Sequence, residues 1–174
     1  MAIYLTGDTH LDHGNIIKFC NRPFSSCKEM NEEIIKRWNS RITPKDEIYH
    51  LGDFCMSRDP KRWIQHLDRL NGRIYLIKGN HDKDKTIEAV IDRFVWVKDY
   101  YYLNTQYKNK KISIILMHYA MRVWNRSHHG SFHAFSHSHG CLKDFSRNSM
   151  DVGVDTNNYY PYHINEFIEK LGTL

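Results

Sequence analysis

The sequence of 174 residues predicts an α/β fold in a single domain, and two features support this prediction. Short apolar runs rich in Ile, Val, Leu and Tyr alternate with amphipathic stretches, a pattern typical of strands alternating with helices. No Pro/Gly/Ser-rich linker, internal repeat or low-complexity tract divides the chain, so we expect a single domain over residues 1–174.

Apolar runs of strand length are predicted to form the sheet. The first lies close to the N-terminus and lacks the basic region of a signal peptide, so it is interpreted as a buried strand. The predicted strands are Ala2–Thr6, Glu47–Leu51, Arg73–Ile77, Val95–Leu103, Lys111–Met117, Ser131–Ser136 and Ser149–Val154.

Amphipathic stretches between and after these runs are predicted to be helices. Pro60 suits the first turn of a helix and Asp59 is a suitable N-cap, so one helix is expected to begin at Pro60. The predicted helices are Cys27–Ser40, Pro60–Leu70, Lys83–Ile91 and Ile164–Leu171.

Charge and cysteine content narrow the class of function. The formal net charge of +5 favours a phosphate-bearing substrate, but the excess is modest and spread out, which argues against a dedicated nucleic-acid-binding arm. The four cysteines form no CxxC pair and are expected to be reduced thiols in the cytoplasm. The apolar run Ile112–Met117 is far too short to cross a bilayer, so no membrane partner is expected. The sequence does not indicate an oligomeric state.

Polar residues follow the carboxyl ends of several predicted strands, where open α/β sheets place their sites. Taken singly, each is more often a turn former or a structural residue. Their ordered series is more informative, and glycines beside them permit sharp turns. The series is Gly-Asp8-Thr-His10, Gly-Asp53, Gly-Asn80-His81-Asp82, Met-His118-Tyr and Ser-His137-Ser-His139-Gly. Asp, His and Asn together offer mixed oxygen and nitrogen ligands, suited to Mn²⁺, Fe, Zn²⁺ or Ni²⁺ rather than Ca²⁺.

This series resembles the calcineurin-like metallophosphoesterase superfamily, whose pattern is DxH, GDxx, GNH(D/E), a single H and GHxH. The match runs from Asp8 to His139. The chain particularly resembles the short bacterial and phage-encoded members without a cap domain. In those members, stretches like Asn15-Ile16-Ile17, Tyr49–Asp53 and Asp151–Asp155 also recur. The resemblance implies a four-layer α/β/β/α fold, in which a two-sheet β sandwich is flanked by helices.

The resemblance also implies two divalent metal ions, with Mn²⁺ expected and Fe, Zn²⁺, Ni²⁺ or Co²⁺ as alternatives. By motif position, the two ligand sets are Asp8, His10, Asp53 and His139 for one ion, and Asp53, Asn80, His118 and His137 for the other. Two cations so close repel each other and need a shared anion, which Asp53 and a bridging hydroxide would provide. That hydroxide would be the nucleophile.

His81 is outside both ligand sets. Its role in the family is to contact the transition state or protonate the leaving alkoxide, and Asp82 is predicted to orient its ring. In isolation, Asn80-His81-Asp82 would be interpreted as a turn followed by a helix cap; within the series, the catalytic interpretation is favoured.

The last motif departs from the family, because Ser136 replaces the glycine of GHxH. If that glycine supplied a positive φ, a serine there would cost about 1–2 kcal/mol and shift the loop. Serine is small, so His137 and His139 are still expected to bind metal.

Residues 122–133 lie between two ligand-bearing loops. Arg122 and Trp124 are predicted to bind substrate, the arginine by gripping a phosphate and the indole by stacking on a base. The alternative is a solvated basic loop with Trp124 packed into the core. Further candidates without a role in the site are His128, His129 and His133 as adventitious surface metal binders, and Cys55 as a small buried thiol.

The predicted function is hydrolysis of a phosphoester, with a small phosphodiesterase acting on cyclic or short nucleotidyl substrates favoured. His81 suits a poor alkoxide leaving group, and no capping domain is seen to grip a long polymer. A phosphomonoesterase and a nuclease are alternatives on the same site. A binding scaffold that has lost catalysis is the alternative from another class, disfavoured because the motif histidines are all present.

Overall fold

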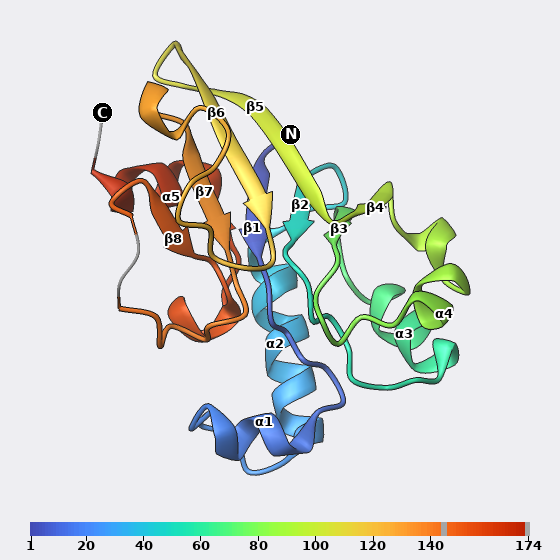
Figure 1. The fold of residues 1–174 in the computed structure, drawn as a ribbon. Helices are drawn as coiled ribbons and strands as arrows, with labels where there is room; N and C mark the ends of the chain where they lie inside the picture. Colours follow the sequence, from blue (N-terminus) through green and yellow to red (C-terminus); the bar gives the residue numbers. More distant parts are fainter. Residues whose placement is uncertain (144–145, 173–174) are drawn as a thin grey trace.

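The structure is a computed structural model that describes residues 1–143 and 146–172, and its strands form two sheets packed against each other (Figure 1). The first sheet has the order β4 (Trp96–Lys98), β3 (Arg73–Ile77), β2 (Glu47–His50), β1 (Ile3–Thr6) and β9 (Tyr162–His163). The second has the order β5 (Tyr100–Tyr107), β6 (Lys110–Met117), β7 (Phe132–Phe135) and β8 (Ser149–Asp151). Both are mixed: β1 to β4 run parallel with β9 antiparallel, and β6 to β8 run parallel with β5 antiparallel.

Helices flank this sandwich, which confirms the predicted α/β architecture. The α-helices are α1 (Gly14–Phe19), α2 (Cys27–Arg41), α3 (Pro60–Leu67), α4 (Asp84–Glu88) and α5 (Ile164–Leu171). Short 3-10 turns occur at η1 (Ile91–Arg93), η2 (Ser127–His129) and η3 (Val154–Thr156). Local signals explain several starts: the Ser26 side chain caps α2, and Asp59 caps α3 directly before Pro60.

Alternation along the strands divides the core in two. On β2, Ile48 faces the apolar side chains of α1 to α4, whereas Tyr49 faces the second sheet. The same alternation on β3 places Leu76 on the helical side and Ile77 between the sheets. The five-stranded sheet is therefore covered on both faces, and its loops rise from a rigid support.

Some elements differ from the sequence-based predictions. The strand predicted over Val95–Leu103 is wrong as a single strand, because the chain passes from the first sheet to the second around Asp99. An extended run looks the same in sequence whether its two halves pair with one partner or two. The short elements α1 and β9 were not predicted, whereas Arg73–Ile77 and Ile164–Leu171 have the predicted bounds. Within the described residues, no helix is long and apolar enough to cross a membrane.

Candidate metal centre

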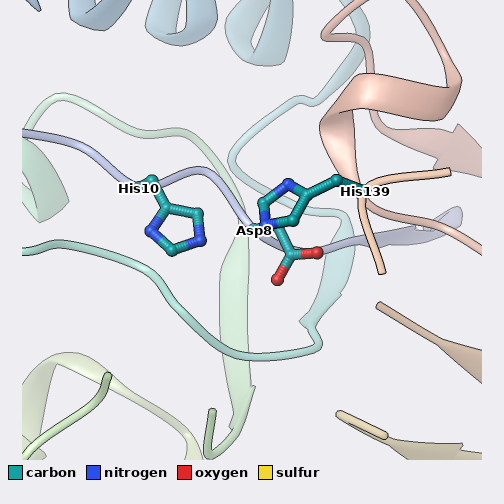
Figure 2. A group of neighbouring side chains, drawn as sticks. All are labelled: Asp8, His10 and His139. Carbon is teal, nitrogen blue, oxygen red and sulfur yellow. The ribbon is translucent and has the colours of Figure 1, made fainter. Parts of the chain in front are cut away.

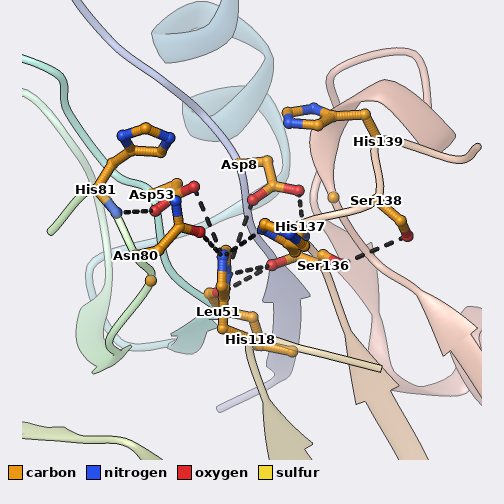
Figure 3. Close-up of polar contacts among 12 residues, drawn as sticks. Asp8, Leu51, Asp53, Asn80, His81, His118, Ser136, His137, Ser138 and His139 are labelled. Carbon is orange, nitrogen blue, oxygen red and sulfur yellow. Dashed lines mark hydrogen bonds and ion pairs between the residues drawn. The ribbon is translucent and has the colours of Figure 1, made fainter. Parts of the chain in front are cut away.

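Loops after β1, β2 and β3 in one sheet, and after β6 and β7 in the other, meet at one end of the sandwich (Figure 3). They bring together the side chains that the sequence predicts as metal ligands. These predicted ligands form two groups whose potential ligand atoms lie within 4.8 Å of one another. We call them the Asp8 group, which is Asp8, His10 and His139 (Figure 2), and the Asp53 group, which is Asp53, His118 and His137.

The backbone at most of these residues is left-handed, a conformation that costs a non-glycine residue about 1–2 kcal/mol. The residues are Asp8 (φ 52°), His10 (φ 48°), Asp53 (φ 55°), His137 (φ 68°) and His139 (φ 48°). Such strain persists only where surrounding contacts fix the chain, and it clusters at functional sites. Here it lets short loops turn their polar side chains inward over the strand ends.

Within the Asp8 group, two buried atoms have no hydrogen-bond partner in the described structure: Oδ1 of Asp8 and Nε2 of His10. A buried polar atom without a partner costs free energy, so this pair indicates a place for a cation. Burial, followed by the charges of Asp151 and Asp53, raises the pKa of Asp8. Burial lowers the pKa of His10, which favours the neutral imidazole that a metal ion needs.

His139 is held by a charged network that sequence reasoning missed. Its Nδ1 lies 2.7 Å from Oδ2 of Asp155, so it donates to that carboxylate and leaves Nε2 for a metal ion. Arg22 donates to both oxygens of Asp155 at 2.8 Å and to the carbonyl oxygens of Asp8 and Thr9 at 2.7 and 3.0 Å. Arg22 is 3% exposed, and it ties the first loop to His139.

In the Asp53 group, the ring of His118 has neutral partners, whereas the backbone N–H groups of Asp53 and His137 donate to the carboxylates of Asp82 and Asp8. Nδ1 of His118 lies 2.7 Å from the carbonyl oxygen of Leu51, which accepts its proton and leaves Nε2 as a ligand. That Nε2 atom lies 3.0 Å from Oδ1 of Asn80, 3.2 Å from Nδ1 of His137 and 3.6 Å from Oδ2 of Asp53. Figure 3 shows these side chains converging on the ring of His118. Oxygen and nitrogen donors so close together fit a divalent cation.

Asp53 lies between the two groups. Its Oδ2 atom is 3.5 Å from Nε2 of His10 and 3.6 Å from Nε2 of His118. Its Oδ1 atom accepts a hydrogen bond from the backbone N–H of His81 at 2.8 Å. A Cβ at Gly79 would collide with this carboxylate, so only glycine permits so close an approach.

His81 and Asp82 have different places in the site. The His81 ring is half-buried beside His10, with ring centroids 5.6 Å apart, and it belongs to neither group. The Asp82 carboxylate accepts from the backbone N–H groups of Asp53, Phe54 and Gly79 at 2.8–2.9 Å. Burial raises its pKa to about 6. Asp82 thus fastens two loops together, and none of its hydrogen bonds in the described structure goes to the His81 ring.

Ser136 does not have the strained backbone expected of a residue that replaces a flexible glycine. Its φ is not among the positive values of the described residues, so the expected cost of 1–2 kcal/mol does not arise. Instead its hydroxyl donates to the carbonyl oxygen of Leu51 at 2.6 Å and lies 3.0 Å from Nδ1 of His118. The close approach of the two loops requires a glycine at Gly7 and not at position 136, because a Cβ at Gly7 would lie only 2.7 Å from the Cβ of Ser136.

The loop that follows His118 lines a cavity of about 680 Å³ next to His137. Arg122 lines this cavity, and its contact with substrate stays a prediction. Trp124 is 7% exposed and its indole N–H donates to Ser131, which matches the packed alternative. The prediction of His133 as a surface metal binder is wrong: its buried ring accepts from the N–H of Met121 and donates to the carbonyl of Ile115.

A β sandwich that gathers Asp, His and Asn side chains at its loop end has the arrangement expected of a metal-dependent phosphoesterase. The family model described as calcineurin-like phosphoesterase matches residues 1–165, so the chain belongs to that family. Its members use divalent metal ions and phosphoester substrates, and the prediction from the motif series is thereby confirmed at family level.

Relatives of known sequence or structure extend over nearly the whole chain. The uncharacterized protein MJ1445 of Methanocaldococcus jannaschii is 36% identical over 173 residues, which are 97% of this chain and 90% of that protein. The crystal structure of AQ665, a protein of unknown function from Aquifex aeolicus, has a TM-score of 0.73 and 26% identity and covers 98% of both chains. An archaeal phosphodiesterase has a TM-score of 0.48 and 15% identity over 94% of this chain and 99% of its own.

Proposed function

We propose that this chain is a phosphodiesterase that uses two divalent metal ions, with Mn²⁺ preferred, and that residues 1–174 act as one domain. The observation that carries the proposal is the place of Asp53, whose Oδ2 atom lies almost equally far from His10 and from His118. One carboxylate can thus serve both groups. When bound, the two cations supply charge neutralisation for the phosphate oxygens and lower the pKa of water.

The ligand assignment follows the two groups. The residues proposed to hold the metal ions are Asp8, His10, Asp53, Asn80, His118, His137 and His139. The unpartnered atoms of Asp8 and His10 support the first half of this assignment. The fixed tautomer of His118, whose Nε2 points to Asn80 and His137, supports the second half.

His81 is proposed to protonate the leaving oxygen or to contact the transition state. Its ring lies beside His10 at the edge of the centre, and its backbone is fixed by Asp53. A histidine in this position can reach the phosphate without using its nitrogen atoms on a metal ion. General acid catalysis of this kind matters most for a poor alkoxide leaving group, which is what a nucleotide diester presents.

A small substrate is favoured by the cavity beside His137. Its volume of about 680 Å³ lies in the range of small-molecule sites, and Met121 and Leu142 give it an apolar wall. The ring of Tyr119 lies edge-on to His137, 4.7 Å away between centroids, and 43% of the residue is exposed. We propose that Tyr119 stacks on a base or another flat group while Arg122 grips a phosphate oxygen.

A substrate panel tests this proposal. Metal-depleted protein is reconstituted with Mn²⁺ and kcat/KM is measured on cyclic nucleotides, dinucleotides, nucleoside monophosphates and single-stranded DNA. We expect the highest kcat/KM on cyclic nucleotides or dinucleotides. Higher values on monophosphates would instead support a phosphomonoesterase, and higher values on DNA a nuclease.

The same panel needs a control for contaminating phosphatases and for the metal itself. Asp53→Asn, purified in parallel, should lose the activity on every substrate that the protein hydrolyses. Elemental analysis of the native protein should find at least two bound metal ions. Activity that survives proven removal of all metal would refute the metal-dependent mechanism, and a stable fold without activity on any phosphoester would favour a binding scaffold.

A further inference from the structure

A second cluster of metal-ligating side chains lies outside the centre described above. It consists of Asp12, in the loop after β1, Cys55, in the loop after β2, and His66, in α3. Cys55 and His66 are 2% and 4% exposed. The ligand atoms of all three lie within 4.8 Å of one another.

From this geometry we propose that Asp12, Cys55 and His66 form a separate site for one thiophilic divalent cation, Zn²⁺ being the best match. The Oδ2 atom of Asp12 lies 3.1 Å from Nε2 of His66 and 3.8 Å from Sγ of Cys55. Ligand atoms around a tetrahedral Zn²⁺, at about 2.0–2.3 Å from the ion, are separated by roughly 3.3–3.7 Å. The observed separations therefore need only small side-chain adjustments.

The state of His66 is an independent observation that points to a ligand. Both ring nitrogen atoms are buried and have no hydrogen-bond partner in the described structure. Nε2 instead makes a close ion-pair contact with Oδ2 of Asp12 at 3.1 Å. A buried imidazole without a hydrogen bond is poorly compensated for its lost hydration, and a cation held between Nε2 and the Asp12 carboxylate would give Nε2 a partner.

The surroundings of Asp12 already hold its carboxylate in place. Asn31 and Arg62 each donate to Oδ1 at 2.7 Å, and Arg62 also donates to Oδ2 at 2.9 Å. Hydrogen bonds of this kind orient ligating carboxylates in metal sites. The φ of Asp12 is 62°, so this residue shares the strained backbone of Asp8 and His10.

Cys55 makes this site chemically different from the catalytic pair. Its thiol is buried, and binding would form a metal–sulfur bond and release the thiol proton to solvent. A thiolate favours Zn²⁺, whereas carboxylate, amide and imidazole donors such as those of the Asp8 and Asp53 groups accept Mn²⁺. The fourth tetrahedral position is left for water.

Such an ion would stabilise the loops that carry the catalytic ligands. Leu11 and Cys55 form a bridge between these two loops, one residue beyond His10 and two residues beyond Asp53. A cation bound to Asp12, Cys55 and His66 would join both loops to α3. The site is therefore structural, and it does not depend on which phosphoester the protein hydrolyses.

The test uses Co²⁺ as a spectroscopic probe, followed by an excess of Mn²⁺. A thiolate ligand gives a sulfur-to-cobalt charge-transfer band in the near ultraviolet, which nitrogen and oxygen donors do not give. We expect this band in the wild-type protein once all sites are saturated, with an intensity that corresponds to one equivalent of bound cobalt. It should persist when Mn²⁺ displaces cobalt from the catalytic pair.

Cysteine variants locate the band. Cys55→Ser should abolish it and remove one equivalent of cobalt, whereas Cys141→Ser, at an exposed thiol, should leave it unchanged. Cys20→Ser is the third variant, because Cys20 lies within ligand distance of His139 and Asp155. Absence of the band in the wild type, its persistence in Cys55→Ser, or its loss in Cys20→Ser would each overturn the proposal. The wild-type result is decisive even if Cys55→Ser does not fold.

Discussion

The Asp8 and Asp53 groups lie side by side but are held by different kinds of contact. His139 of the Asp8 group donates to Asp155, whose charge is in turn compensated by Arg22. His118 of the Asp53 group donates instead to a backbone carbonyl. The His139 ring thus depends on a buried ion pair, and the His118 ring on a neutral hydrogen bond.

This difference predicts different sensitivities. A buried ion pair is costly to break from one side, because the remaining charge is left uncompensated. A neutral hydrogen bond contributes about 1 kcal/mol, and its loss is smaller if another donor or acceptor takes over. The Asp8 group should therefore respond strongly to loss of the charged support of His139, whereas the Asp53 group should respond little to loss of the neutral support of His118.

The largest effect is expected for Asp53→Asn, because this residue contacts both groups. Loss of the charge between two cations should lower kcat by at least ~10³-fold and weaken both metal affinities. Asp8→Asn, as the matched control, should weaken one affinity more than the other. Metal titration and kcat of the two variants measure this. Two tightly bound ions and near-normal turnover in Asp53→Asn would show that the carboxylate is not shared.

His81→Ala should leave both groups intact and still remove much of the activity. General acid catalysis is worth ~10²–10⁴-fold, so kcat on an alkyl diester should fall by that factor. On an activated aryl ester, whose phenolate leaves without a proton, the loss should be smaller. Metal content and kcat on the two esters are the measurements.

Comparing the loss of kcat on the two esters distinguishes a catalytic role of His81 from a general loss of folding. A misfolded variant would lose both activities equally, and its melting temperature would fall. An equal loss in a well-folded variant would leave only an electrostatic or positioning role for His81. Loss of a metal ion would show that His81 is a ligand, and the division of the site into two groups would need revision.

Asp155→Asn tests the charged support of the Asp8 group directly. The amide keeps the size of the side chain but removes the charge that faces His139 and Arg22. Loss of such a partner typically costs 10–100-fold in metal affinity, so one of the two affinities should fall by about that factor. The other should change little. Equal weakening of both would contradict the separate supports.

The sequence could predict the ligands but not their supports. The motifs place Asp8, His10 and the other ligands at strand ends, and the structure brings these side chains together. Arg22 and Asp155 are 133 residues apart and belong to no common motif, so their ion pair exists only in the folded chain. The recurrence of Asp151–Asp155 in related short members was the one signal that pointed to Asp155.

Other differences have local causes. The motif context favoured Asp82 as a partner of the His81 ring, but three backbone N–H groups surround its carboxylate. Backbone donors have no sequence signature, so this role could not be read in advance. For Trp124 the sequence left stacking and packing open, and burial distinguishes them only once the second sheet is in place.

The smallest effect is expected for Ser136, the neutral support of the Asp53 group. Ser136→Ala removes the hydroxyl near His118, but the Leu51 carbonyl still accepts the Nδ1 proton and preserves the tautomer. Stability should therefore fall by about 1 kcal/mol, with metal affinity nearly unchanged.

Ser136→Gly restores the family glycine but should not improve the site, because the backbone here does not have a positive φ. It should cost a further ~0.5–1 kcal/mol from the greater freedom of the unfolded chain. Thermal melts and metal titrations of both variants check this. A gain in metal affinity in Ser136→Gly would mean that serine strains the loop after all, and that its hydroxyl is not a useful support of His118.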